Sequence, residues 1–128
     1  MRDYQAHKSK YLLPNEVYHL TLWTIRDYER MKAEADAIIF ESPAPPDGQP
    51  HGTATLDETF SKAARREEKI RKTRAIETAL EIVPEEYRRG VWDNVQEMKA
   101  FPRDADRTTY SRWKSRFIFE AANKLGIY

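Results

Sequence analysis

The sequence has no cysteine, only four glycines among 128 residues, and no long apolar run. Without cysteine the chain can form neither a disulfide framework nor a thiolate metal site. The N-terminus is polar and lacks the apolar segment of a signal peptide. No stretch approaches the roughly 20 apolar residues that span a membrane, and the mean hydropathy is -0.85. These absences predict a cytoplasmic protein without a membrane partner.

Signatures of catalysis and of metal binding are also lacking. His7, His19 and His51 are scattered along the chain, and no two of them have a metal-ligand spacing. There is no glycine-rich phosphate loop, no nucleophile elbow and no dinucleotide fingerprint. Glu85 and Glu86 fit the positive end of a helix dipole better than an acid/base pair. We therefore expect no enzymatic activity, no catalytic residue, no metal and no cofactor.

Charged residues make up 34% of the chain and are unevenly distributed, although the net charge is only +1. Basic side chains concentrate in residues 61–74 and 99–116. The first cluster contains Lys62, Arg65, Arg66, Lys69, Arg71, Lys72 and Arg74. The second contains Lys99, Arg103, Arg107, Arg112, Lys114 and Arg116. Each cluster has only two acidic residues, so each is a local positive patch of the kind that contacts phosphates.

Apolar residues recur at helical spacing along most of the chain, and the sequence shows neither a strand pattern nor an internal repeat. Helices are expected over residues 14–40, 56–83, 84–102 and 106–125. Asp106 is a good N-cap residue for the last helix, and Gly126 followed by Ile127 is typical of a glycine C-cap sealed by a hydrophobic contact. The sequence thus predicts an all-α fold, a small bundle of about four helices.

A segment rich in proline and glycine, residues 41–55, is expected to be a linker. It separates an N-terminal arm and helix, residues 1–40, from a helical domain of DNA-binding type, residues 56–128. Leu22 and Trp23 lie off the main apolar stripe of the first helix. We therefore expect that helix to contact two neighbours or a partner chain, so that its second apolar face forms either the seam of a homodimer or a docking surface for another partner.

The stretch 104–126 combines a basic, hydroxyl-rich beginning with an aromatic inner side. This is how a DNA-recognition helix is usually built, with base and phosphate contacts in front and core anchors behind. An ordinary solvated face explains the same charges about as well. The candidate DNA-binding residues are Arg103, Arg107, Thr108, Thr109, Ser111, Arg112, Lys114, Ser115 and Arg116. In the other cluster a solvated face is favoured, with phosphate contact as the alternative for Lys62, Arg65, Arg66 and Lys69.

Two segments resemble small phage and prophage regulators of Gram-positive bacteria. They are residues 75–90, AIETALEIVPEEYRRG, and residues 109–126, TYSRWKSRFIFEAANKLG. The pattern is similar to that of late-gene transcriptional activators of the RinA and ArpU type, whose C-terminal half resembles the helix-turn-helix of sigma-factor region four. The resemblance covers about residues 75–126. It implies a C-terminal helix-turn-helix-like unit in which the candidate residues of 107–116 face DNA.

The resemblance further implies a regulator of transcription that binds double-stranded DNA in the bacterial cytoplasm, in association with the nucleoid. RNA polymerase or another regulator would be a second partner. Only residues 99–106 are available for the scaffold helix and turn before the recognition helix, and Pro102 interrupts them. That segment forms either one short helical turn or a degenerate helix-turn-helix. Two other functions stay open: a non-enzymatic protein-interaction adaptor, and a small terminase-like DNA-packaging subunit.

Overall fold

The computed structural model of the chain describes residue 5 and residues 10–40 and 53–128, and all regular structure in them is helical. The helices of these ranges are α1 (Asn15–Arg26), α2 (Tyr28–Phe40), α3 (Thr53–Leu80), α4 (Glu85–Glu97) and α5 (Arg107–Lys124). The predicted all-α class is confirmed, with one helix more than expected.

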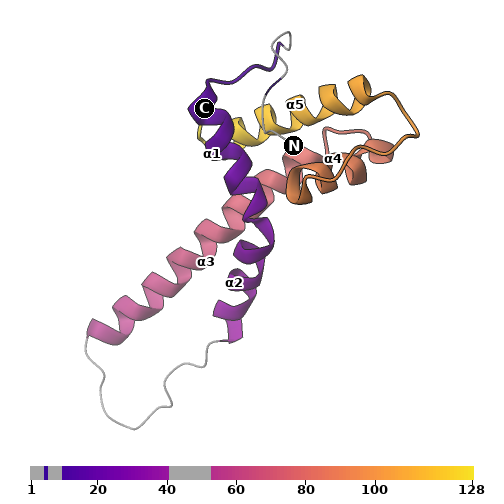
Figure 1. The fold of residues 1–128 in the computed structure, drawn as a ribbon. Helices are drawn as coiled ribbons and strands as arrows, with labels where there is room; N and C mark the ends of the chain where they lie inside the picture. The colour runs from indigo at the N-terminus through magenta and orange to yellow at the C-terminus, as the bar shows by residue number, and fades with distance from the viewer. Residues whose placement is uncertain (1–4, 6–9, 41–52) are drawn as a thin grey trace.

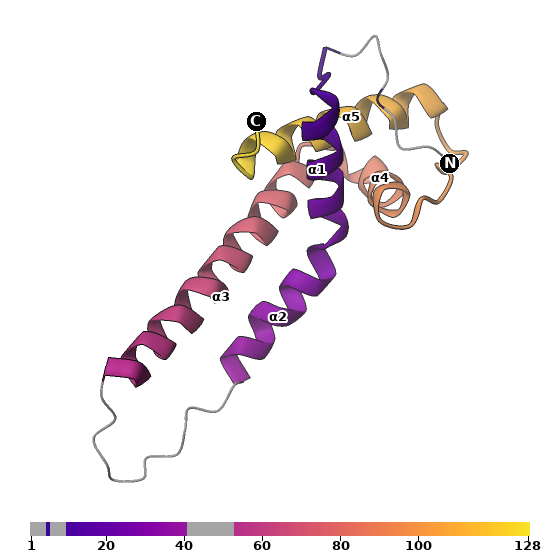
Figure 2. The same cartoon turned by 60° about the vertical axis from the view of Figure 1, so that its left-hand side comes forward.

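The helices form a head and a stalk (Figures 1 and 2). In the head, α1, α4 and α5 pack together, and the C-terminal part of α3 packs on α5. In the stalk, α2 and the rest of α3 lie side by side and extend away from the head. The core therefore lies mainly in the head, where α1, α3 and α4 all contact α5.

Aromatic side chains of α5 form the centre of this core. Tyr110 and Phe117 are fully buried, and Trp92 of α4 packs edge-on against Tyr28 and tilted against Phe117. Burial of such large apolar side chains is the main favourable term in folding. The predicted inner side of the last helix is confirmed, because the following residues lie in or against the core: Tyr110, Trp113, Phe117, Ile118, Ala121 and Leu125.

The single helix predicted over residues 14–40 is wrong, because the structure has two helices that meet at Asp27. Neither proline nor glycine lies there, so the cause is tertiary. Nε2 of Gln96 donates to the Ile25 carbonyl at 2.6 Å, and Nε of Arg26 donates to the Val95 carbonyl at 2.8 Å. A side chain bonded to a carbonyl of the helical ladder is a common cause of a bend. These bonds fix α1 to the end of α4, while α2 turns away to pack on α3.

The second predicted helix starts earlier and ends earlier than expected, since α3 spans Thr53–Leu80 and not 56–83. The last part of the predicted linker, residues 53–55, is therefore helical, while residues 41–52 lie outside the described ranges. Beyond α3, Arg88 donates to the carbonyls of Val83 at 2.7 Å and Glu81 at 2.9 Å. These bonds satisfy carbonyls that have no helical partner in the turn between α3 and α4.

The end of α5 has the predicted glycine cap. Gly126 has a left-handed φ of 75°, which a residue without Cβ adopts at little cost. Its amide donates to the Asn123 carbonyl at 3.1 Å, and the amide of Ile127 donates to the Ala122 carbonyl at 2.9 Å. This bonding pattern is a Schellman motif, and Ile127 packs against the core as the motif requires.

Candidate nucleic-acid interface

The loop 98–106, which leads into α5, is held by side-chain packing. Met98 ends α4 in a left-handed conformation with φ 58°. The ring of Phe101 stacks on Tyr110 with centroids 5.3 Å apart and planes 12° apart. The Tyr110 hydroxyl donates to Oδ1 of Asp104 at 2.6 Å. These contacts set the position at which α5 begins.

Gly90 allows α4 to approach this loop closely. A Cβ at Gly90 would lie 2.6 Å from Cε1 of Tyr110 and 2.7 Å from Cδ of Pro102. The hydrogen bond to Asp104, together with burial, raises the pKa of Tyr110 to about 12. The hydroxyl therefore remains a donor throughout the neutral range, and α4, the loop and the start of α5 form one packed unit.

Of the two expectations for residues 99–106, the short helical turn is wrong. The segment contains a turn at residues 103–104 but no helix. The connection between α4 and α5 therefore runs over residues 98–106 and is longer than the 3–4-residue turn that joins the helices of a helix-turn-helix. Met98 ends α4 in a left-handed conformation, and Pro102 further on has no amide that could continue a helical ladder.

The candidate residues on α5 do not all share one side of the helix. With 3.6 residues per turn, Thr108, Arg112 and Arg116 follow one another along the outer side, away from the buried Tyr110 and Phe117. Thr109 and Ser115 flank this row and are half-buried. Thr108 and Arg112 are exposed, whereas Arg116 is half-buried. Of this row, the structure therefore brings Thr108 and Arg112 together on the solvent-exposed surface.

Two candidates lie on the inner side of α5. Lys114 is one turn from both Tyr110 and Ile118, which are buried. Ser111 is one turn from Ser115 and two turns from Ile118. Both Lys114 and Ser111 are half-buried. These two residues therefore do not extend the open row of Thr108 and Arg112.

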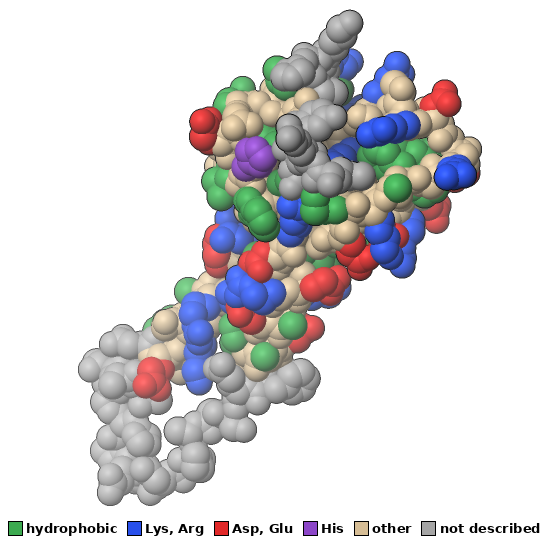
Figure 3. Space-filling model, in the orientation of Figure 1, with side chains coloured by type: hydrophobic (Ala, Val, Ile, Leu, Met, Phe, Trp, Pro, Cys, Tyr) green, Lys and Arg blue, Asp and Glu red, His purple; other side chains and the backbone are tan. Residues whose placement is uncertain are grey.

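Three arginines at or just before the beginning of α5 form no ion pair with an acidic side chain of the described residues. Arg103 in the loop and Arg107 and Arg112 on α5 are exposed, and none of them forms an ion pair within the described ranges. The first turn of α5 has no acidic residue, and Asp106 makes no side-chain cap bond there. Figure 3 shows Lys and Arg side chains gathered at this end of the head. The positive end of the helix dipole adds to their potential.

Tyr11, which precedes α1, covers the outer side of α5 one turn further on. Its ring lies 5.4 Å from the guanidinium carbon of Arg116 and meets Phe119 edge-on at 5.4 Å. Nε of Arg116 is buried and has no hydrogen-bond partner among the described residues. Two bonds between the Gln5 side chain and the Leu13 backbone, both 2.8 Å, fix the segment that carries Tyr11. Arg116 is therefore less accessible than Arg112.

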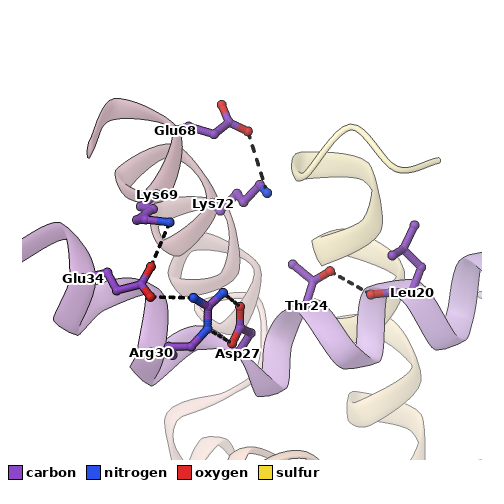
Figure 4. Close-up of polar contacts among 8 residues, drawn as sticks. All are labelled: Leu20, Thr24, Asp27, Arg30, Glu34, Glu68, Lys69 and Lys72. Carbon is purple, nitrogen blue, oxygen red and sulfur yellow. Dashed lines mark hydrogen bonds and ion pairs between the residues drawn. The ribbon is translucent and has the colours of Figure 1, made fainter. Parts of the chain in front are cut away.

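The basic cluster on α3 differs, because three of its seven cations, Lys69, Arg71 and Lys72, are paired with carboxylates. Glu34 of α2 bonds Arg30 at 2.6 Å and Lys69 of α3 at 2.9 Å, as Figure 4 shows. The hydrogen bond from Lys69 is the main cause that lowers the pKa of Glu34 below its usual value. Arg71 and Lys72 pair with Glu68 in the same way. This part of α3 is mainly a stalk-forming surface, which agrees with the solvated alternative.

Between α2 and α3 lies a groove of about 340 Å³. Its walls include Arg65, Lys69 and Lys72, but also Asp27 and Glu68. Of the secondary candidates, Arg65 is exposed, Lys62 and Arg66 are half-buried, and Lys69 is paired with Glu34. Arg30 also lines the groove, but Arg30, Lys69 and Lys72 are paired with carboxylates, which leaves Arg65 as the cation of the groove lining without an ion pair within the described ranges.

No family model, curated protein or solved structure matches this chain. Within residues 10–40 and 53–128, no helix is long and apolar enough to cross a membrane. The same residues contain no group of three or more histidine, aspartate or glutamate side chains placed to hold a metal ion.

Sequence reasoning missed two residues that shape the interface. Asp104 was counted only as an acidic residue in the second cluster, although it bonds Tyr110 and fixes the loop. Its spacing of six residues from Tyr110 is not a recurrent helical spacing and gave no signal. Tyr11 lies in the N-terminal segment for which the sequence predicts no contact with DNA, although it covers Arg116. A lone tyrosine more than 100 residues away in sequence carries no pattern that connects it to α5.

Proposed function

We propose that this protein binds double-stranded DNA through the start of α5 and the loop before it, and acts as a phage-type transcriptional regulator. The observation that supports this most is the exposed trio Arg103, Arg107 and Arg112, which has no acidic partner within the described ranges. On α3, Lys69 and Arg71 are paired with carboxylates, while Arg65 and Arg74 are exposed without an ion pair in those ranges but lie inside the helix, away from its N-terminus. Unpaired arginines beside a helix N-terminus favour phosphate groups.

The position of each arginine determines which chemical groups of DNA it can contact. Arg103 and Arg107 lie at the entry to α5 and suit phosphates of the backbone, which give affinity but no sequence information. Arg112 and Thr108 lie on the outer side of the helix, where an arginine can bond a guanine edge in the major groove. Because the loop 98–106 replaces a tight turn, α4 is not placed as the supporting helix of a standard helix-turn-helix.

A binding experiment with duplex DNA tests the proposal. The wild-type chain and the double variant Arg107→Ala, Arg112→Ala are titrated against a labelled duplex pool at several salt concentrations. Losing the phosphate contact of Arg107 should reduce the slope of log affinity against log salt by about 1, and losing the base contact of Arg112 as well should weaken binding roughly tenfold or more at low salt. Selection from a random duplex pool with the wild type then shows whether one sequence is enriched.

A matched control separates the local effect from a loss of net charge. The double variant Arg71→Ala, Arg89→Ala removes the same two charges, but from arginines that are paired with Glu68 and Asp93. It should keep affinity within about twofold of the wild type, since rim charges away from the interface contribute only long-range potential. Equal binding by the wild type and both double variants at every salt concentration contradicts the proposal and leaves the adaptor as the favoured function.

A further inference from the structure

The outer side of α5 is open at its start and covered further along. Thr108, Arg112 and Arg116 follow one another on this side, but only the first two are exposed. The ring of Tyr11, which precedes α1, lies 5.4 Å from the guanidinium carbon of Arg116 and meets Phe119 edge-on at 5.4 Å. A segment from the N-terminal end of the chain therefore lies on the side of α5 that a DNA groove would receive (Figures 1 and 2).

Residues 10–13, which we call the strap, are anchored in the head at one end. Leu13 is buried in the core, and its backbone makes two hydrogen bonds of 2.8 Å with the Gln5 side chain. The strap contacts α5 through the Tyr11 ring, by a cation–π contact with Arg116 and by an aromatic contact. Each of these two contacts is weaker than burial of a leucine side chain. The Tyr11 ring can therefore leave α5 while Leu13 stays in the core.

The covered guanidinium of Arg116 is incompletely satisfied. Its Nε is buried without a hydrogen-bond partner among the described residues, and Arg116 forms no ion pair with them. The face of an aromatic ring attracts a cation but is a weak hydrogen-bond acceptor. A phosphate accepts two parallel bonds from a guanidinium. Arg116 would therefore gain bonds by exchanging the Tyr11 ring for a phosphate.

The strap and a DNA groove cannot share this side of α5. The major groove is about 12 Å wide and 8.5 Å deep, and a helix with its side chains is about 10–12 Å across. No room is left for a second chain segment between the helix and the bases. We propose that the strap is autoinhibitory, a role that rests on the proposed function: it covers α5 in the free protein and is displaced when Arg116 contacts a DNA phosphate.

Removal of the Tyr11 ring should strengthen DNA binding. A protein that binds only in its open state has its affinity reduced by the fraction of molecules that are open. Since one cation–π contact and one aromatic contact hold the strap closed, Tyr11→Ala should bind the labelled duplex pool about tenfold more tightly than the wild type at low salt. The uncovered Arg116 adds a phosphate contact, so the slope of log affinity against log salt should become steeper by about 1.

Four further variants of the full chain separate uncovering of α5 from other effects. Tyr11→Phe keeps the ring and should bind more like the wild type than like Tyr11→Ala. Gln5→Ala loosens the strap without altering its contact with α5, and should raise affinity by a smaller factor. Tyr128→Ala removes a different ring that meets Phe119, at 6.1 Å, and should bind like the wild type. Tyr11→Ala combined with Arg116→Ala should lose both the gain in affinity and the steeper salt slope.

Failure of the strap and failure of DNA binding give different results. If the wild type binds the duplex and neither Tyr11→Ala nor Gln5→Ala binds more tightly, the strap is not autoinhibitory, although the proposed function stands. A gain that persists after Arg116→Ala also overturns the inference, because the strap would then not act by covering Arg116. If neither the wild type nor Tyr11→Ala binds the duplex at any salt concentration, the strap and the proposed function both fail.

Discussion

Replacing Gly90 with alanine sets two effects of opposite sign against each other. Gly90 lies inside α4, where alanine is intrinsically favoured over glycine by about 1 kcal/mol. The added Cβ would lie 2.6 Å from Cε1 of Tyr110 and 2.7 Å from Cδ of Pro102. Carbon atoms pack best at about 3.5–4.0 Å, so each contact is about 1 Å too short. The two contacts come from α5 and from the loop, and both would have to move.

The side chains around Gly90 cannot move away from an added Cβ without losing contacts of their own. The ring of Tyr110 is stacked on Phe101, meets Tyr87 edge-on, and is tied to Asp104 through its hydroxyl. Overpacking typically costs about 1–3 kcal/mol, and two simultaneous overlaps of about 1 Å put this site at the upper end, about 2–3 kcal/mol. After subtracting the helix-propensity gain, Gly90→Ala should lower the free energy of unfolding by about 1–2 kcal/mol and the melting temperature by roughly 5–10 °C.

Denaturant and thermal unfolding followed by circular dichroism measure this effect, and Gly126→Ala is the matched comparison. At Gly126 no atom lies within 4 Å of the added Cβ, but φ is 75°, so the cost is purely one of backbone conformation, about 1–2 kcal/mol. The two variants thus isolate steric overlap and backbone strain. If Gly90→Ala unfolds at or above the wild-type temperature, the close packing of α4 on Tyr110 and Pro102 is refuted.

Three other perturbations have defined outcomes. Tyr110→Phe should lower the free energy of unfolding by about 1 kcal/mol through loss of the bond to Asp104. Because the folded pKa of Tyr110 is raised to about 12, its contribution is fully present below about pH 10 and is lost as pH rises toward 12. The stability difference between Tyr110→Phe and wild type should therefore shrink over that interval in unfolding experiments, and a constant difference would contradict it. Lys69→Met should raise the pKa of Glu34 toward its usual value in an NMR titration, since the bond from Lys69 is the main cause of the lowered value; an unchanged pKa would disprove the Lys69–Glu34 ion pair. Gln96→Ala should cost about 1 kcal/mol in denaturant unfolding by removing the bond to the Ile25 carbonyl, and no loss would argue against its role in bending the chain at Asp27.

Much of α5 could be predicted from sequence because its signals are local. The spacing of Tyr110, Trp113 and Phe117 defines the inner side, and Gly126 marks the end. Local periodicity also places Arg112 on the outer side. These features depend on residues within a few turns of each other, so the local apolar periodicity of the sequence is enough to predict them. The exposure of Arg112 follows in the same way, whereas the burial of Arg116 does not, because it depends on Tyr11.

By itself, the sequence determined the all-α class, the position of α5 and its Schellman cap, because helical periodicity and a glycine with positive φ are properties of neighbouring residues. Only the tertiary structure decided where the first helix breaks, since the bond from Gln96 to Ile25 joins residues far apart in sequence. It also decided which cations are left without partners: Lys69 finds Glu34 across the stalk, and Arg112 at the start of α5 finds no carboxylate within the described ranges. Pairing of charges depends on how helices pack, and no periodicity encodes it.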